Sequence, residues 1–383
     1  MELRYGMNPH QSAAPVLPVR PGDEPIRLLN GTPSYINLLD ALNAWQLVSE
    51  AGRALGGQVV AASFKHVSPA GVALAGPLDQ AAAELYGVAP TGLGPVASSY
   101  LRARDADPKS SYGDFAAVSH PVDVELADLL ATVVCDGIIA PDYHPGAVER
   151  LSRKKRGRFL VLAADPGYRP PGREVRELYG LRLEQDRDQV ELSPELLQLS
   201  VGEELPPAAV TDLLLGLAVL RYTQSNSVCY VRDGVTVGIG AGQQSRVDCT
   251  RLAGAKTDLW WLRRHPAVRA LEFRPEVRRQ DRINGQLRYL EGDLPAADAA
   301  ALLATPAAEL TDRQRAAWLA ELTGVSFVSD GALPFRDNVD FAARHGVTRI
   351  AEPGGSIRSA GVEQACREHG ITLARTGLRL FHH

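Results

Sequence analysis

A lysine and a histidine stand side by side where a predicted strand ends, in the run Lys65-His-Val-Ser-Pro-Ala-Gly71. Histidine titrates near neutral pH and can remove a proton from a nucleophile, while an adjacent lysine can stabilise an oxyanion or protonate a leaving nitrogen. The pair therefore fits proton transfer at the mouth of an α/β enzyme, where catalytic groups commonly lie. An ordinary surface or packing role is the alternative that this motif alone leaves open.

Uncharged polar side chains cluster in Tyr222-Thr-Gln-Ser-Asn-Ser-Val-Cys-Tyr230, directly after an apolar helix. A buried Asn or Gln can polarise a carbonyl or hold a carboxamide. A helix end and turn satisfied by short polar side chains would have the same composition, so both interpretations stay open.

Glycines punctuate the run Gly238-Ile-Gly-Ala-Gly-Gln-Gln-Ser-Arg246, which follows a predicted strand. Its third glycine is misplaced for a dinucleotide-binding loop, and no acidic residue ends a second strand. The run better fits a loop that a backbone approaches closely and that ends in an anion-pairing arginine.

A further turn, Pro353-Gly-Gly-Ser356, stands between a predicted strand and a predicted helix. Its backbone N–H groups could meet a carboxylate or phosphate, or the segment could be a tight turn with a serine cap. Arg4-Tyr5 near one end of the chain and Arg379 near the other have solvated surface as their default interpretation.

The elements that must position these residues alternate between helix and strand, as in α/β domains. Helical spacing or apolar character predicts helices over Leu38 to Leu55 and about Ala208 to Tyr222, and an amphipathic helix that ends near Glu368. Residues 262–323 are rich in Arg, Ala, Leu and Glu without clear strand runs, which predicts a helical insert. Strands are predicted at Gln58 to Phe64, Val235 to Gly240, Val347 to Ala351 and Ile371 to Ala374.

Length and composition limit the remaining choices. The 383 residues exceed one ordinary hydrophobic core, which predicts two or three domains. A net charge of −4 gives no general attraction to nucleic acid or membrane, so any anion site must be local. The four scattered cysteines are expected to be reduced and mostly buried. No signal peptide or membrane span is evident, so we expect a cytoplasmic protein.

Together these segments resemble one family along essentially the whole chain: the formyltransferase (AICAR transformylase) half of the bifunctional purine biosynthesis enzyme that also carries IMP cyclohydrolase. The resemblance is carried by the following runs: Arg4-Tyr-Gly-Met-Asn-Pro-His-Gln11, Asp40-Ala-Leu-Asn-Ala-Trp-Gln-Leu47, Lys65 to Gly71, Ser111-Tyr-Gly-Asp-Phe115, Ser225-Asn-Ser227, Gly238 to Arg246, Pro334-Phe-Arg-Asp-Asn338 and Leu378-Arg-Leu-Phe-His-His383. It implies transfer of a formyl group from 10-formyltetrahydrofolate to the exocyclic amine of 5-aminoimidazole-4-carboxamide ribonucleotide (AICAR).

The resemblance also implies site residues. His66 looks like the general base, Lys65 its partner at the formyl group or the leaving folate nitrogen, and Asn226 the group that holds the carboxamide. The implied nucleotide ligands are Arg4, Tyr5, Asn37, Gly113, Asp136, Arg246 and Arg379. The implied folate-side residues are Val247, Pro334, Phe335, Asp337, Asn338, Ser356 and Ile357.

The fold implied by the resemblance is a pair of cytidine-deaminase-like α/β units, over residues 1–165 and over 166–262 with 324–383, and a small helical insert over 263–323. A homodimer with active sites at the subunit interface is expected. The zinc signature of deaminases is absent, so no zinc is expected. A structural potassium ion near Tyr222 to Ser227 is left open.

In the bifunctional enzyme a cyclohydrolase domain precedes the Arg-Tyr-Gly-Met motif, which begins here at Arg4. We therefore expect formyl transfer without ring closure, and a separate cyclohydrolase in the pathway.

One departure is that Ala332 and Leu333 stand where the family has two aromatic residues. A paralogous formyltransferase that acts on an analogous nucleotide in nucleoside-antibiotic biosynthesis is therefore a second hypothesis. A non-catalytic folate- or nucleotide-binding protein is a third, but it would have no need of both the Lys65-His66 pair and Asn226.

Overall fold

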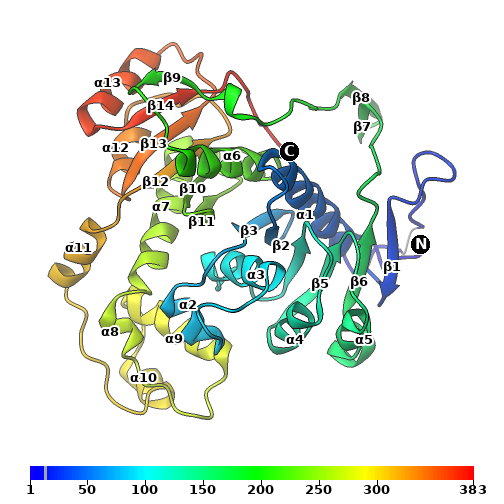
Figure 1. The fold of residues 1–383 in the computed structure, drawn as a ribbon, viewed down its shortest axis with the longest axis horizontal. Helices are drawn as coiled ribbons and strands as arrows, with labels where there is room; N and C mark the ends of the chain where they lie inside the picture. Colours follow the sequence, from blue (N-terminus) through cyan, green and yellow to red (C-terminus); the bar gives the residue numbers. More distant parts are fainter. Residues whose placement is uncertain (13–14) are drawn as a thin grey trace.

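A mixed sheet of 12 strands runs through the molecule, with helices on both of its faces (Figure 1). The computed structural model describes residues 1–12 and 15–383. A mixed α/β protein is what the alternating sequence pattern predicts, and the structure confirms this fold class.

The elements follow one another in a regular order. Those up to residue 164 are β1 (Ile26–Asn30), α1 (Tyr35–Ala54), β2 (Val60–Lys65), β3 (Ser68–Leu74), α2 (Gln80–Tyr86), α3 (Pro95–Ala106), β4 (Asp114–Val118), α4 (Val124–Thr132), β5 (Cys135–Ala140), α5 (Ala147–Ser152), the 3-10 turn η1 (Lys154–Gly157) and β6 (Leu160–Ala164). Those that follow are β7 (Arg173–Leu178), β8 (Leu181–Asp186), the 3-10 turn η2 (Pro194–Leu196), β9 (Gln198–Val201), α6 (Pro207–Arg221), β10 (Val228–Arg232), β11 (Val235–Gly240), α7 (Arg246–Leu262), α8 (Pro266–Arg269), α9 (Arg279–Glu291), α10 (Ala296–Leu302), α11 (Asp312–Ala320), β12 (Val325–Ser329), α12 (Asp337–Ala343), β13 (Val347–Glu352), α13 (Ser359–His369) and β14 (Thr372–Arg375). The predicted helix over Leu38 to Leu55 is confirmed as α1, and the predicted helix over Ala208 to Tyr222 as α6.

The strand order repeats one topology twice. The sheet runs β1-β6-β5-β4-β2-β3-β11-β10-β12-β13-β14-β9. In the first half, β2 and β3 form a hairpin, β4 pairs antiparallel with β2, β5 and β6 follow in parallel, and β1 closes antiparallel. The second half uses β10, β11, β12, β13, β14 and β9 in the corresponding places with the same directions. The two halves therefore have equivalent strands, and α1 corresponds to α6 and α3 to α7 in chain order.

The two halves join where β3 meets β11. These strands are antiparallel, with Val235 opposite Ala73. The Thr236 hydroxyl adds a second link, because it accepts a hydrogen bond from the Val72 N–H at 2.8 Å and donates one to the Val72 carbonyl at 3.2 Å. Both strands are buried almost throughout, as the apolar run at Val235 to Gly240 predicts.

Each face of the sheet is covered by one hydrophobic cluster that spans both halves. On one face α1 and α6 pack, with Leu47 and Leu217 fully buried. On the other lie α3, α4, α7, α12 and α13, with Leu101 and Leu126 fully buried. Both buried clusters cross the boundary between the two halves of the sheet.

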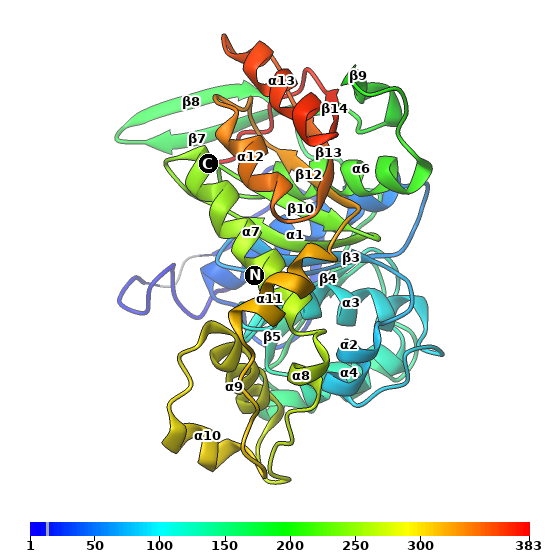
Figure 2. The same cartoon turned by 90° about the vertical axis from the view of Figure 1, so that its left-hand side faces the viewer.

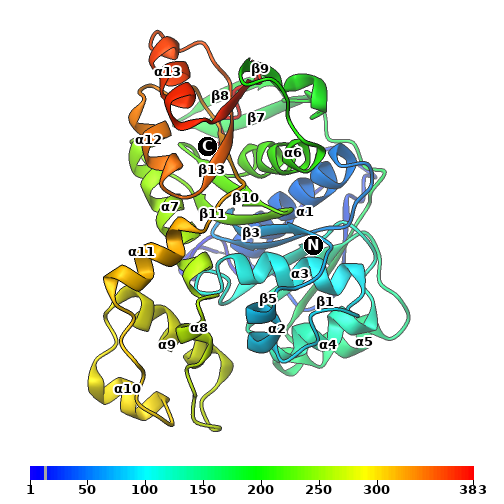
Figure 3. The ribbon, with the colours of Figure 1, turned by 60° about the vertical axis from the view of Figure 1, so that its left-hand side comes forward.

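A group of helices, α8 to α11, connects α7 to β12 and lies beyond one end of the sheet (Figure 3). It has its own small cluster, which includes Leu262, Val268 and Leu290. Trp261 and Trp318 tie it to α7, since their rings stack at 5.5 Å and each indole N–H donates to the other residue's carbonyl, at 2.8 and 3.0 Å. The helices predicted for residues 262–323 are confirmed as α8 to α11.

A two-stranded hairpin, β7–β8, extends away from the rest of the molecule (Figure 2). Nearly all its residues are exposed, including five large apolar side chains: Val175, Leu178, Tyr179, Leu181 and Leu183. An isolated hairpin is marginally stable in water at best. Exposed apolar side chains gathered on such an arm are typical of a contact surface.

All four cysteines are buried and unpaired, as their scattered spacing predicts. Over the described residues, no helix is both long and apolar enough to span a membrane.

Two glycines allow the helices α3 and α7 to approach the sheet closely. A Cβ atom on Gly71 of β3 would lie 2.1 Å from the Ala103 carbonyl of α3, and one on Gly238 of β11 would lie 2.2 Å from the Ala253 carbonyl of α7. An alanine at either position would therefore force the helix and the strand apart. The same packing device therefore stands in equivalent places of the two halves.

We predict that Gly71→Ala and Gly238→Ala each lower the free energy of unfolding by about 2 to 3 kcal/mol, because both overpack a helix–sheet contact. Urea denaturation measures the loss. Gly361→Ala is the control, since a Cβ there meets open space and α13 should tolerate or welcome alanine. Equal effects of all three substitutions would contradict the close-packing explanation.

Candidate active site

The Lys65–His66 pair lies at the turn between β2 and β3. The two central residues of this turn, His66 and Val67, have positive φ angles of 54° and 58°. Hairpin turns of this kind normally use Asn-Gly or Asp-Gly, because the left-handed conformation is costly for other residues and most of all for a β-branched valine. Backbone strain of this kind concentrates at functional sites, so the geometry favours a functional role for His66 over an ordinary surface role.

Asp40 of α1 supports this turn. Its Oδ1 atom accepts a hydrogen bond from the Val67 N–H at 2.7 Å. Burial raises the pKa of the Asp40 carboxyl, while the Val67 N–H and the charge of His66 act in the opposite direction. His66 is exposed, and Lys65 Nζ donates to the Tyr112 carbonyl at 2.6 Å. The turn therefore presents the imidazole at the surface and fixes the ammonium group beside the start of β4.

Asn226 lies between α6 and β10 with its amide orientation fixed. Its Nδ2 atom donates to the carbonyls of Gln243 and Gln244, at 2.9 and 3.2 Å, and its Oδ1 atom accepts from Arg246 Nη2 at 2.7 Å. The peptide bond between Ser225 and Asn226 is cis. Both amide protons are used, so what Asn226 can offer a ligand is the second lone pair of Oδ1.

Arg246, predicted to pair with an anion, pairs with a carboxylate of the protein itself. Its Nη1 atom bonds Asp330 and, at 3.0 Å, the Ser329 hydroxyl. The other oxygen of Asp330 accepts from the Ser225 hydroxyl at 2.6 Å and the Ser227 N–H at 2.9 Å. Asp330 is fully buried and Arg246 nearly so. This network joins the start of α7, the end of β12 and the segment around Asn226.

The turn and Asn226 lie at the same edge of the sheet. Because β3 and β11 are antiparallel with Val235 opposite Ala73, the end of β11 comes level with the start of β3, which the His66 turn precedes. Asn226 precedes β10, whose start pairs with the end of β11. Two segments 160 positions apart, at residues 66 and 226, are thereby brought to one edge.

Most of the predicted nucleotide ligands lie at this edge or at the start of α1, the helix that carries Asp40. Arg4 is exposed, its Nη2 atom donates to Asn37 Oδ1 at 3.4 Å, and its guanidinium lies 5.5 Å from the centre of the Tyr5 ring. Gly113 and Asp136 lie at the starts of β4 and β5; β4 pairs with β2, whose end carries Lys65, and β5 pairs with β4. Asp136 bonds Lys155, whereas a Cβ on Gly113 would meet open space.

Arg379 belongs to a C-terminal segment that is tied to the Asn226 region. The Leu380 N–H donates to the Asp330 carbonyl at 2.9 Å, and the Ser225 N–H donates to the His382 carbonyl at 2.9 Å. Arg379 itself is exposed, with its guanidinium 5.1 Å from the Phe381 ring centre. The structure therefore brings the segment that carries Arg379 beside the segment that carries Asn226.

The predicted folate-side residues form a second group, beside the ends of β12 and β13. The guanidinium of Arg358 lies 5.2 Å from the Phe335 ring centre, which joins the two loops. Asn338 is buried and accepts from the Thr250 hydroxyl of α7 at 3.0 Å, so α7, which carries Val247, belongs to the same group. Phe335 is half exposed and Ile357 fully exposed. Pro334, Asp337 and Ser356 lie in the same two segments.

Asp40 and Asp330 are the residues that sequence reasoning missed. Asp40 stood inside a motif that carries the family resemblance, but its partner is 27 positions away. Asp330 precedes the run that contains Ala332, and its pairing with Arg246 spans 84 positions. No local pattern signals either contact.

A cavity of about 700 Å³ lies at the opposite edge of the sheet, around the Asp233–Gly234 turn, and includes none of the predicted site residues. Some of the predicted residues are exposed, such as Phe335 and Ile357, whereas Arg246 and Asn338 are buried. Their individual binding roles stay predictions.

Comparison with known proteins finds a matching family model and similar proteins. A family model described as "AICARFT/IMPCHase bienzyme" matches residues 1–256. The chain is 33% identical over 386 residues to the bifunctional purine biosynthesis protein PurH of Roseobacter denitrificans, covering 100% of this chain and 59% of that protein. It is 32% identical over 384 residues to PurH of Mesorhizobium japonicum, with 100% and 58% covered. The chain thus spans less than two thirds of the length of these relatives.

We predict that Asp330→Ala lowers the free energy of unfolding by about 3 to 5 kcal/mol, because it leaves the Arg246 guanidinium buried without its carboxylate. Chemical denaturation measures the change. Asp340→Ala removes a partly exposed ion pair with Arg336 and should cost no more than about 1 kcal/mol. Similar losses for both variants would show that the Asp330 network is not the buried link described above.

Proposed function

Because the chain belongs to the AICARFT/IMPCHase bienzyme family of purine biosynthesis enzymes, we propose that it transfers a formyl group from 10-formyltetrahydrofolate to the exocyclic amine of AICAR. The products are formyl-AICAR and tetrahydrofolate. The observation that carries this proposal is the strained Lys65–His66–Val67 turn at the same sheet edge as Asn226.

Formyl transfer to AICAR requires a general base, a group that stabilises the oxyanion and a hydrogen-bond acceptor close to one another. The amine of AICAR is conjugated with an imidazole carboxamide and is a poor nucleophile, so its attack on the formyl carbon needs proton removal and stabilisation of a tetrahedral oxyanion. His66 takes the amine proton. Lys65 stabilises the oxyanion or protonates the folate nitrogen as it leaves. The remaining lone pair of Asn226 Oδ1 accepts an N–H from the carboxamide or amine and orients it.

The two ligand sides differ in character, as two different substrates require. Arg4 and Arg379 are exposed cations suited to a phosphate, and Tyr5, Asn37, Gly113 and Asp136 complete the nucleotide side. Arg246 acts through Asn226, which it orients. Phe335 and Ile357 expose apolar surface suited to the folate ring system, with Val247, Pro334, Asp337, Asn338 and Ser356 around them.

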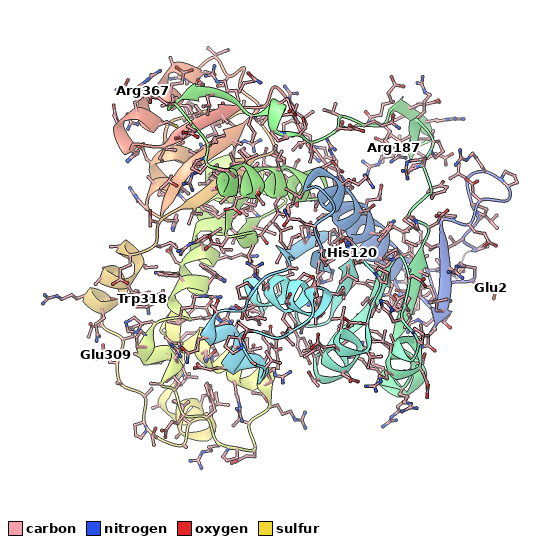
Figure 4. All side chains as sticks on the ribbon, viewed as in Figure 1. Glu2, His120, Arg187, Glu309, Trp318 and Arg367 are labelled. Carbon is pink, nitrogen blue, oxygen red and sulfur yellow. The ribbon has the colours of Figure 1, made fainter. Side chains whose placement is uncertain are left out.

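A homodimer completes the site in this proposal. The β7–β8 arm exposes apolar side chains that a second copy would cover. Arg187, which follows β8, lies on this arm, on the opposite side of the molecule from Trp318 of α11 (Figure 4).

A potassium ion near Tyr222 to Ser227 fits one feature of the chain. The Ser227 hydroxyl is buried and lacks a hydrogen-bond partner in the part of the chain that the structure describes. A monovalent cation held there would order the backbone that carries Asn226, without taking part in formyl transfer.

Two cytidine-deaminase-like units, with the boundaries expected from the resemblance, are part of the same proposal. The repeated strand topology supports it.

Leu333 is fully buried and Ala332 only partly so, which limits the departure from the family's aromatic pair to one accessible position.

We predict that the purified chain, given AICAR and 10-formyltetrahydrofolate, releases tetrahydrofolate and forms formyl-AICAR, followed by chromatography. Inosine monophosphate should appear only when a cyclohydrolase is added. His66→Ala should lower kcat by at least about 100-fold with AICAR affinity within about tenfold, because the base acts in the chemical step.

Retention of most of the catalytic rate by His66→Ala would remove His66 from the mechanism. A panel of carboxamide nucleotides in place of AICAR tests the paralogue hypothesis, which requires another acceptor to be formylated much faster. Transfer to no acceptor would refute the proposal.

We predict that the parent chain is a dimer in light-scattering measurements of molecular mass, and that replacing Leu178, Tyr179 and Leu181 together by serine shifts it to monomer. The apolar contact made by the arm is lost in that variant. Leu252→Ser, an exposed leucine of α7, is the control and should leave the mass unchanged. A dimer that survives the triple substitution would exclude the arm as the contact.

A further inference from the structure

In each half of the chain, an aspartate of a helix accepts hydrogen bonds from the backbone of a hairpin turn. In the second half Asp212 of α6 takes the place that Asp40 of α1 has in the first. Its carboxylate accepts hydrogen bonds from the Asp233 and Gly234 N–H groups, at 3.2 and 2.7 Å, at the turn between β10 and β11. The two turn residues have φ angles of 52° and 72°. Helix, carboxylate and left-handed turn thus correspond in the two halves.

The residue types at the two turns differ. Asp-Gly is an ordinary pair for a turn with two positive φ angles, so the β10–β11 turn would adopt this shape with little help. His66 and Val67 pay a steric cost for it, and valine adopts positive φ rarely. The same carboxylate support is therefore needed far more at the first turn, which is the one that carries the candidate base.

The contacts of Asp40 fit this requirement. Asp40 is 9% exposed, and its Oδ1 lies 2.7 Å from the nitrogen of Val67, the turn residue with the greater steric cost. It reaches the backbone of the turn and leaves the His66 imidazole exposed.

We propose that Asp40 is a positioning residue, which holds the His66–Val67 turn in its left-handed form through the Val67 N–H and thereby aims the His66 imidazole at the reacting amine. This rests on the function proposed above. Asp212 has the same geometry without a base to aim.

The kinetic test compares Asp40→Ala with Asp212→Ala. We expect Asp40→Ala to lower kcat by about 30- to 100-fold with KM for AICAR within about threefold, because the base is misplaced while the nucleotide contacts persist. Asp212→Ala, checked for comparable loss of melting temperature, should keep kcat within about twofold. Equal loss of kcat in both variants would reduce Asp40 to a general stability role and overturn the proposal.

Two further variants separate the hydrogen bond from the charge and from folding. Asp40→Asn keeps an oxygen that can accept from Val67 and should stay within about fivefold of the parent kcat. Asp40→Ala combined with Val67→Gly should recover at least about fivefold over Asp40→Ala alone, because glycine adopts the turn without strain. An asparagine variant as impaired as alanine, or no recovery by Val67→Gly, would contradict a positioning role.

Amide hydrogen exchange gives a readout that does not depend on formyl transfer. Asp40→Ala should increase exchange at Val67 more than Asp212→Ala increases exchange at Gly234, since the His-Val turn depends more on its carboxylate. If the parent chain formylates no acceptor, the proposed function fails, and this comparison still decides whether Asp40 holds the turn. An unchanged Val67 amide would overturn the inference.

Discussion

The antiparallel contact between β3 and β11 determines where everything else in this protein can meet. It joins two halves of equal topology into one sheet, and because the strands run in opposite directions, the turn of one hairpin lies beside the open end of the other. The His66 turn and Asn226 come to one edge for that reason, and the Asp233–Gly234 turn goes to the opposite edge. Displacing this contact by two residues would carry the Asn226 segment about 7 Å away from His66.

Local sequence patterns predicted individual helices and strands, but they could not predict which distant segments pair with one another. The helical spacing from Leu38 and the apolar run at Val235 correctly predicted α1 and β11, since both depend on neighbours a few positions away. The pairing of Val235 with Ala73 and of Arg246 with Asp330 could not be predicted, because each links segments more than 80 positions apart and any buried strand or carboxylate would have satisfied the local signal. The motifs located candidate residues, and the fold determined which of them share an edge.

Buried carboxylates are used here to fix backbone rather than to react. Asp40 and Asp212 bind the N–H groups of turns, and Asp330 joins a serine hydroxyl, an amide and Arg246. Burial raises the pKa of the Asp40 carboxyl, and it raises the pKa of Asp212 to about 6. Removing such a group costs more than its contacts contribute, since the partners stay desolvated. The groups that face solvent at the candidate site, His66 and Arg379, are thus carried by segments that hydrogen bonds to Asp40 and Asp330 hold in place.

The tryptophans of the helical insert make it visible by spectroscopy. Trp260, Trp261 and Trp318 stack in one row where α7 meets α11, and they are three of the four tryptophans in the chain. Intrinsic fluorescence therefore reports chiefly on this seam, whereas circular dichroism averages over the sheet and all the helices. If the insert undocks before the sheet melts, the two signals will change at different denaturant concentrations, and an apparent failure of two-state unfolding will locate the weakest joint of the molecule.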